Sequence, residues 1–152
     1  MGKSVKNYHI AIIMSLVFLV VALVLECIPG SIIMPFSAVR EDGSAGKIYC
    51  SYCYFSTTPF AYALFTPMIT GIITIVLIGL FIFRIFRYSK LVTVCTILPL
   101  VGGVTAITHL FLQADVNTIT PSGIFVSSCL FMAFILNLLD YLHKKYTLNQ
   151  SN

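Results

Sequence analysis

Four long apolar segments dominate this sequence and restrict what the chain can fold into. They cover residues 9–28, 59–83, 91–112 and 120–142, and each reaches the roughly 20 residues with which an α-helix crosses a bilayer. Only 9% of the residues are charged, against about 25% in ordinary soluble domains. The pattern predicts an all-α fold, an integral membrane four-helix bundle that forms a single domain over residues 1–152. It excludes disorder, a coiled coil, a nucleic-acid module and a typical soluble enzyme, so the expected surroundings are a lipid bilayer.

A secretory signal peptide is the alternative for the first apolar segment, because a basic start precedes it. Residues 26–30 read ECIPG, however, which lacks the small-x-small pattern of a cleavage site. We therefore expect this segment to be retained as a membrane helix.

The basic residues are distributed unequally between the two sides that four spans would create. Seven of the nine Lys and Arg residues lie on the side that holds both termini and the connection after the second span, and two lie on the other side. Because Lys and Arg near the spans set orientation, both termini are predicted to be cytoplasmic, with residues 29–58 and 113–120 facing outward. The seven are Lys3, Lys6, Arg84, Arg87, Lys90, Lys144 and Lys145, and the two are Arg40 and Lys47.

Residues 29–58 form the longest polar segment, and an outer loop is expected there. Turn residues and mixed charges fill its centre, whereas residues 32–36 are apolar enough to lie in the interface or against the mouth of the bundle. Thr-Pro pairs at residues 58–59 and 120–121 precede the second and fourth spans. A threonine cap followed by proline at the first helical position is a favoured helix start.

Cys50 and Cys53 form a C-x-x-C pair on the predicted outer side, ahead of the second span. Paired thiols at this spacing can form a reactive disulfide. The arrangement resembles the quinone-linked membrane oxidoreductases that regenerate disulfides, but that family needs a second cysteine pair, and residues 113–120 contain none. The alternative is a structural disulfide or two incidental interfacial thiols. Claudin-like junction proteins are excluded because the chain has no Trp.

Glu26 and His109 are the two ionisable residues best placed to lie inside the bilayer. Each falls a few residues from the predicted outer end of its span, so both are expected at similar depth. Ionisable groups in a membrane are costly and often functional, and a carboxylate beside an imidazole can relay protons or hold a cation. We favour two interfacial side chains that reach water, because both lie near helix ends. Contact between them depends on helix rotation, which the sequence leaves open.

Prolines and glycines interrupt two of the apolar segments. Pro67 either kinks the second helix or opens it. Pro99, Gly102 and Gly103 lie near the middle of the third segment, where a broken helix would suit a transporter. Small residues also allow close helix contact, and Gly102 and Ala106 have the four-residue spacing that favours it. We expect packing rather than transport.

The charged residues at the cytoplasmic ends of the spans have ordinary explanations. Arg84, Arg87 and Lys90 are expected to meet anionic headgroups. Asp140 precedes Lys144 by four residues, the spacing of a helix ion pair. No metal-ligand spacing, phosphate loop or nucleophile elbow is present, so neither a metal site nor a cofactor is expected.

The segment from Tyr54 to Pro67, YFSTTPFAYALFTP, is the most distinctive part of the chain. It resembles the aromatic entrance to the second span in small uncharacterised four-span membrane proteins of Gram-positive bacteria. That family has no assigned activity, so the resemblance implies a multi-pass protein of a bacterial cell membrane and nothing catalytic. From its residues alone, the segment is an interfacial aromatic anchor between two prolines.

These observations predict a non-catalytic accessory or partner-binding membrane protein that engages another membrane protein. One alternative is an outward-facing thiol-disulfide oxidoreductase using Cys50 and Cys53. The other is a small transporter or channel component that uses Glu26, His109 and a break in the third helix.

Overall fold

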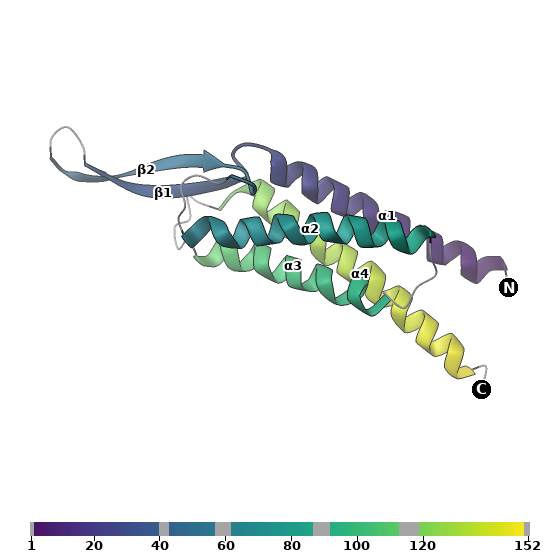
Figure 1. The fold of residues 1–152 in the computed structure, drawn as a ribbon. Coiled ribbons are helices and arrows are strands. Elements are labelled where there is room, and N and C mark those ends of the chain that lie inside the picture. The colour runs from purple at the N-terminus through teal and green to yellow at the C-terminus, as the bar shows by residue number, and fades with distance from the viewer. Residues whose placement is uncertain (1, 40–42, 57–61, 87–91, 113–118, 151–152) are drawn as a thin grey trace.

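Helices make up most of the structure, a computed structural model that describes residues 2–39, 43–56, 62–86, 92–112 and 119–150. The helices are α1 (Gly2–Cys27), α2 (Tyr62–Phe86), α3 (Val92–Leu112) and α4 (Pro121–Gln150), and the strands are β1 (Ile32–Val39) and β2 (Ala45–Tyr52). The helices form a bundle, and the strands form a hairpin that projects from one end of it (Figure 1). The chain ends lie at the other end. We call these the hairpin end and the terminal end.

Three of the described helices are long and apolar enough to cross a membrane. Their apolar stretches cover Ile10–Cys27, Phe65–Ile85 and Pro121–His143, and α3 has a shorter one at Thr93–Thr108. Many large apolar side chains on these helices point away from the bundle, such as Val24, Phe125 and Leu139, each more than half exposed. A helix that is apolar on all sides belongs in the core of a large protein or in a membrane.

The expectation of an all-α chain is wrong in one respect, because the predicted outer loop contains a two-stranded sheet. The strands pair antiparallel, from Ile32 opposite Tyr52 to Val39 opposite Ala45. Alternate residues of β1 share a face, which places Ile32, Met34 and Phe36 on one side. The first two are buried in the core at the base of the hairpin. These apolar residues and the turn residues between the strands favour a hairpin over an irregular loop.

Hydrogen bonds tie the base of the hairpin to the bundle. The backbone N–H of Tyr54 donates to the carbonyl oxygen of Glu26 at 3.0 Å, which joins the chain after β2 to the end of α1. Gly30 has a φ of +92°, a conformation that favours glycine, and its N–H donates to the Tyr52 carbonyl. Thr120 donates to the Ser31 carbonyl at 2.6 Å, which joins the turn before β1 to the start of α4.

The predicted threonine cap of the fourth helix is confirmed. α4 begins at Pro121, and the N–H of Gly123 donates to the hydroxyl oxygen of Thr120 at 3.1 Å. This is the bond that an N-cap side chain makes with the third helical residue. The corresponding pair at residues 58–59 lies outside the described residues.

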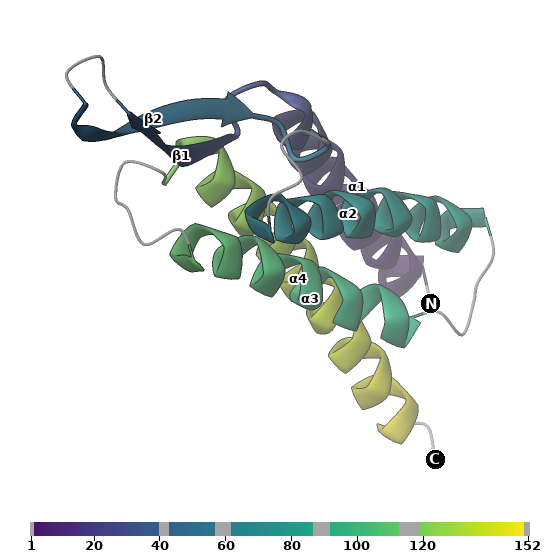
Figure 2. The same ribbon diagram turned by 60° about the vertical axis from the view of Figure 1, so that its left-hand side comes forward.

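The bundle packs α1 against α2 and α4, and α3 against α2 and α4 (Figure 2). Its buried apolar residues come from all four helices and from the hairpin base, and those on the helices are Ile12, Leu19, Leu77, Phe81, Cys95, Ala106, Val126, Leu130 and Ala133. Pro67 and Pro99 lie inside continuous helices, so neither one begins or ends its helix.

The glycines of α3 are packing positions, as expected. A Cβ atom on Gly102 would lie 3.1 Å from a methyl carbon of Ile73 and 3.5 Å from one of Leu130, so this glycine brings α3 close to α2 and α4. A Cβ on Gly103 would lie 3.2 Å from the ring of Phe131. Since α3 continues through both glycines, the broken helix considered for a transporter is not observed.

Gly102→Leu should therefore force α3 away from its neighbours and destabilise the bundle by about 1–3 kcal/mol, the usual cost of overpacking. Gly79→Leu is the matched control, because nothing lies within 4 Å of a Cβ at Gly79. Thermal unfolding in detergent should show a lower midpoint for the first variant alone. Equal midpoints for the two variants would contradict the close contact.

Candidate functional site

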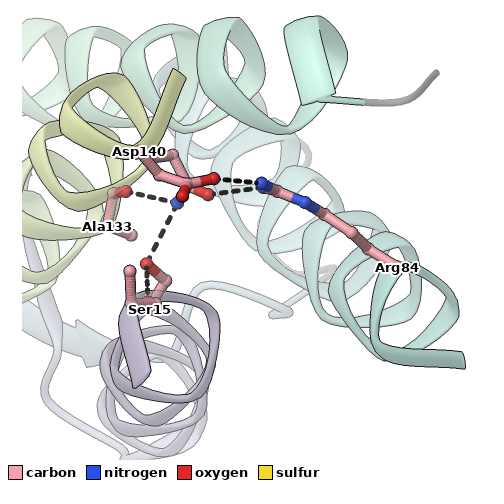
Figure 3. A network of polar contacts seen from close by, with 6 residues as sticks. Ser15, Arg84, Ala133 and Asp140 are labelled. Carbon is pink, nitrogen blue, oxygen red and sulfur yellow. Dashed lines mark hydrogen bonds and ion pairs between the residues drawn. The ribbon is translucent and has the colours of Figure 1, made fainter. Parts of the chain in front are cut away.

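The most extensive polar cluster in the described structure centres on Arg84, which is 1% exposed. Its Nη1 donates to Oδ1 of Asn137 at 2.8 Å, and its Nη2 donates to Oδ2 of Asp140, also at 2.8 Å. Figure 3 shows the Arg84 side chain extending from α2 toward Asp140 on α4. A charge-assisted pair of this geometry is the arrangement that allows a cation to lie inside an apolar bundle.

Asn137 extends the cluster to α1. Its amide Nδ2 donates to Oγ of Ser15 at 3.0 Å and to the carbonyl oxygen of Ala133 at 2.6 Å. Ser15 in turn donates to the Ala11 carbonyl at 2.9 Å. Both hydrogens of the Asn137 amide and its oxygen are thus used. The thiol of Cys95, on α3, is within hydrogen-bonding reach of Arg84, so the Arg84 cluster touches all four helices.

The assignment of Arg84 to lipid headgroups is therefore wrong, whereas the pair expected between Asp140 and Lys144 stays a prediction. Arg84 is buried and pairs with Asp140 across the bundle. The reason is that α2 continues to Phe86, so the Arg84 side chain meets α4 before the helix ends. The side chains of Arg87, Lys90 and Lys144 lie outside the described part of the chain.

A second polar cluster lies toward the hairpin end, around Glu26. This carboxyl group is fully buried, and its Oε1 is 2.8 Å from the hydroxyl oxygen of Thr74 on α2. Its other oxygen, Oε2, has no hydrogen-bond partner among the described residues. The expectation that Glu26 reaches water at the interface is therefore wrong, because the hairpin base and α2 cover it.

Tyr54 lies beside Glu26 and is also fully buried. Burial raises the pKa of the Tyr54 phenol, and the nearby Glu26 carboxylate acts in the same direction. The phenol is therefore neutral at ordinary pH. This position differs from the interfacial anchor expected for the aromatic segment. The next residue, Phe55, also faces the bundle, since its ring occupies the space above Gly71 of α2.

Thr70 and Thr105 continue the Glu26 cluster from α2 to α3. Their hydroxyl oxygens are 2.9 Å apart, and Thr105 also donates to the carbonyl oxygen of Gly102. Thr70 is one turn from Thr74, whose hydroxyl is 3.1 Å from the Thr70 carbonyl oxygen. Ten residues separate Thr74 from Arg84, which is about 15 Å along α2. Apolar side chains such as Leu77 and Phe81 fill the space between the clusters.

His109 is the other ionisable residue that the sequence places at the depth of Glu26. Its side chain lies outside the part of the chain that the structure describes, so the expectation that it reaches water stays a prediction. Thr74 and Tyr54 are the neighbours of Glu26 that the structure provides.

The two cysteines of the C-x-x-C pair are not joined in a disulfide. Cys50 lies on β2 opposite Met34, and its thiol interacts with the Tyr52 hydroxyl. Cys53 follows the end of the strand, where its sulfur is 3.3 Å from Oγ of Ser56. The thiols thus engage different neighbours. Among the described residues, no three His, Cys, Asp or Glu side chains gather in a way that could hold a metal ion.

Sequence reasoning identified Glu26 but missed most residues that surround it or form the Arg84 cluster. Thr70 and Thr74 look ordinary in a membrane segment, where hydroxyls commonly bond to their own helix. Asn137 carried a usable signal, because it lies three residues before Asp140 and the two therefore share a helix face.

The sequence matches no family model, and no curated protein or solved structure is significantly similar to it.

The Arg84–Asp140 pair leads to a prediction for stability. Arg84→Leu should cost about 3–5 kcal/mol, because it leaves the Asp140 carboxylate buried without its cation. The double variant Arg84→Leu, Asp140→Leu should recover most of that loss, since no buried charge stays behind. Unfolding of the four proteins of this cycle gives the coupling energy. Additive losses would show that the pair makes no net interaction.

Proposed function

We propose that this protein is a multi-pass membrane protein with no catalytic role that binds a partner through its projecting hairpin. The observation that carries the proposal is the hairpin itself, a two-stranded sheet standing off the end of an apolar bundle (Figure 1). Isolated two-stranded hairpins are marginally stable, and a sheet edge is a template for another strand. The occupant that we propose is an extended segment of another membrane protein, added as a third strand.

The two edges of the hairpin differ in a way that selects β2. β1 contains Pro35, which has no N–H and which faces Tyr49 across the sheet. Proline is tolerated in a strand where its nitrogen points away from the partner strand, and it blocks further pairing on that side. The corresponding edge of β2 has no proline. A third strand therefore pairs with β2.

The distal half of the hairpin has side chains that such a partner would cover. Ile32 and Met34 are buried at the base, but Ile48 is 55% exposed on the same face. Val39, on the opposite face, is 79% exposed. Exposed apolar side chains beside an open strand edge give a partner both backbone bonds and side-chain contacts.

The polar clusters inside the bundle support a structural rather than a catalytic role. Arg84 donates to Asn137 and Asp140 within the bundle, and the side chains of Arg84 and Asn137 are both 1% exposed. A reacting group would need access to a substrate. The thiol-disulfide alternative rests on Cys50 and Cys53 alone, whose thiols contact different neighbours.

The orientation is part of the proposal. Since both chain ends lie at the terminal end, the seven basic residues counted there would be cytoplasmic and the hairpin would face outward. The resemblance of the aromatic segment favours the cell membrane of a bacterium.

A photo-reactive residue placed at Ile48 should cross-link the partner in native membranes. Pro35 faces Tyr49 across the sheet, and Ser51 lies two residues after Tyr49 on β2. Residues two apart on a strand point their N–H groups to the same side, so the N–H of Ser51, like that of Tyr49, points to the open edge of β2. Ser51→Pro should lower the affinity about tenfold or more, because the missing bond and its unpaired partner cost about 1–3 kcal/mol. Ser51→Thr retains the N–H and is the matched control. An adduct that Ser51→Pro leaves unchanged would contradict pairing at this edge.

Labelling of single cysteines tests the orientation. In a chain without native cysteines, thiols introduced at residues 44 and 117 should react with an impermeant reagent outside intact cells. Thiols at residues 88 and 148 should react only after the membrane is opened. Labelling of residue 148 in intact cells would overturn an arrangement with both ends inside.

A further inference from the structure

We propose that Glu26 is a proton-binding site of the bundle, occupied by a proton that the carboxyl group shares with Thr74. The proposal is independent of any partner at the hairpin. It concerns a buried acid that the partner-binding role does not use.

The hydroxyl group of Thr74 lies between two oxygen atoms, one on Glu26 and one on Thr70. The hydroxyl oxygen is 2.8 Å from Oε1 of Glu26 and 3.1 Å from the carbonyl oxygen of Thr70. Both of those atoms are acceptors when Glu26 is ionised, yet a threonine hydroxyl has a single hydrogen. A protonated carboxyl supplies the second hydrogen. Glu26 then donates to Thr74, and Thr74 donates to the Thr70 carbonyl.

Glu26 and Asp140 are both buried acids, but their surroundings differ. Asp140 lies 2.8 Å from the Arg84 guanidinium, so its negative charge is matched by a cation. Glu26 is fully buried, and its Oε2 has no partner among the described residues. An isolated charge in apolar surroundings is strongly disfavoured, and proton uptake removes it. The same fold thus holds one acid as an ion pair and the other as a proton carrier.

The groups that face Glu26 are compatible with a neutral acid. Among the side chains that the structure describes, the titratable one beside Glu26 is Tyr54, in the chain after β2, and this phenol is itself neutral. The described neighbours on α2, Thr70 and Thr74, contribute hydroxyl groups, which carry no charge. A metal cation at Glu26 would need several oxygen ligands besides the carboxyl group, whereas a proton needs none. The ligand that neutralises this single carboxyl group is therefore a proton.

The position of Glu26 sets the side from which the proton arrives. Glu26 is the second-last residue of α1, and its carbonyl oxygen accepts the bond from Tyr54 at the hairpin base. The Arg84 cluster lies toward the terminal end, beyond an apolar layer that contains Leu77 and Phe81. The proton therefore exchanges at the hairpin end of the bundle.

Dicyclohexylcarbodiimide, an apolar reagent, tests the proposal on the full-length protein in membranes. The acid O–H adds across a C=N bond of the reagent, with the proton passing to nitrogen, and the acyl group then migrates from oxygen to nitrogen. The product is an N-acylurea that contains the whole reagent. Mass spectrometry at neutral pH should find Glu26 labelled at least tenfold more than Asp140. Labelling should fall as the pH rises, because only the protonated carboxyl reacts.

Glu26→Gln should abolish this labelling and should keep the fold, since the amide can still donate to Thr74. Asp140→Asn is the matched control and should leave the labelling of Glu26 unchanged. Equal labelling of the two acids would overturn the proposal. Protection of Glu26 by sodium ions would also overturn it, because it would identify a metal cation as the ligand.

Infrared spectroscopy keeps the test decisive if the reagent fails to reach the carboxyl. A protonated carboxylic acid has a C=O stretching band that a carboxylate lacks. This band should be present at neutral pH, should disappear in Glu26→Gln and should persist in Asp140→Asn. Its absence from the unmodified protein would show that Glu26 carries no proton.

Discussion

The pairing of Arg84 with Asp140 and Asn137 is the interaction on which the arrangement of the helices depends. A guanidinium inside an apolar bundle is tolerated only when its charge and its N–H groups are matched, and here α4 supplies both partners. This pairing fixes the rotation of α2 and α4 about their own axes and their relative position along the bundle axis. Because Asn137 also reaches Ser15, α1 is held to the same position. Apolar contacts alone are less specific, since lipid chains compete for the same surfaces.

The two polar clusters of the bundle differ in how their charges are satisfied. The Arg84 cluster combines a cation, an anion and an amide whose hydrogens are used within the bundle. The Glu26 cluster combines one acid with hydroxyl groups, and one carboxyl oxygen has no partner in the described structure. The first arrangement fixes the fold. The second leaves a group able to gain or lose a proton, close to the base of the hairpin.

The hairpin depends on the bundle in turn. A two-stranded sheet buries little by itself, and this one is stabilised where Ile32 and Met34 enter the core. The bond between Tyr54 and the Glu26 carbonyl and the bond between Thr120 and Ser31 fix where it leaves the bundle. The strands beyond these attachments project from the helices (Figure 2), which leaves the edge of β2 open for the third strand that we propose.

The sequence by itself determined the helices, because length and apolar content are local properties. It predicted the four apolar segments, the cap at Thr120 and the packing role of Gly102, all of which depend on neighbouring residues or on residue size. Only the tertiary structure decided which polar side chains meet. Arg84 and Asp140 are 56 residues apart, and Glu26 and Thr74 are 48 apart. Such pairs depend on helix rotation and neighbour order, which an almost uniformly apolar helix surface does not encode.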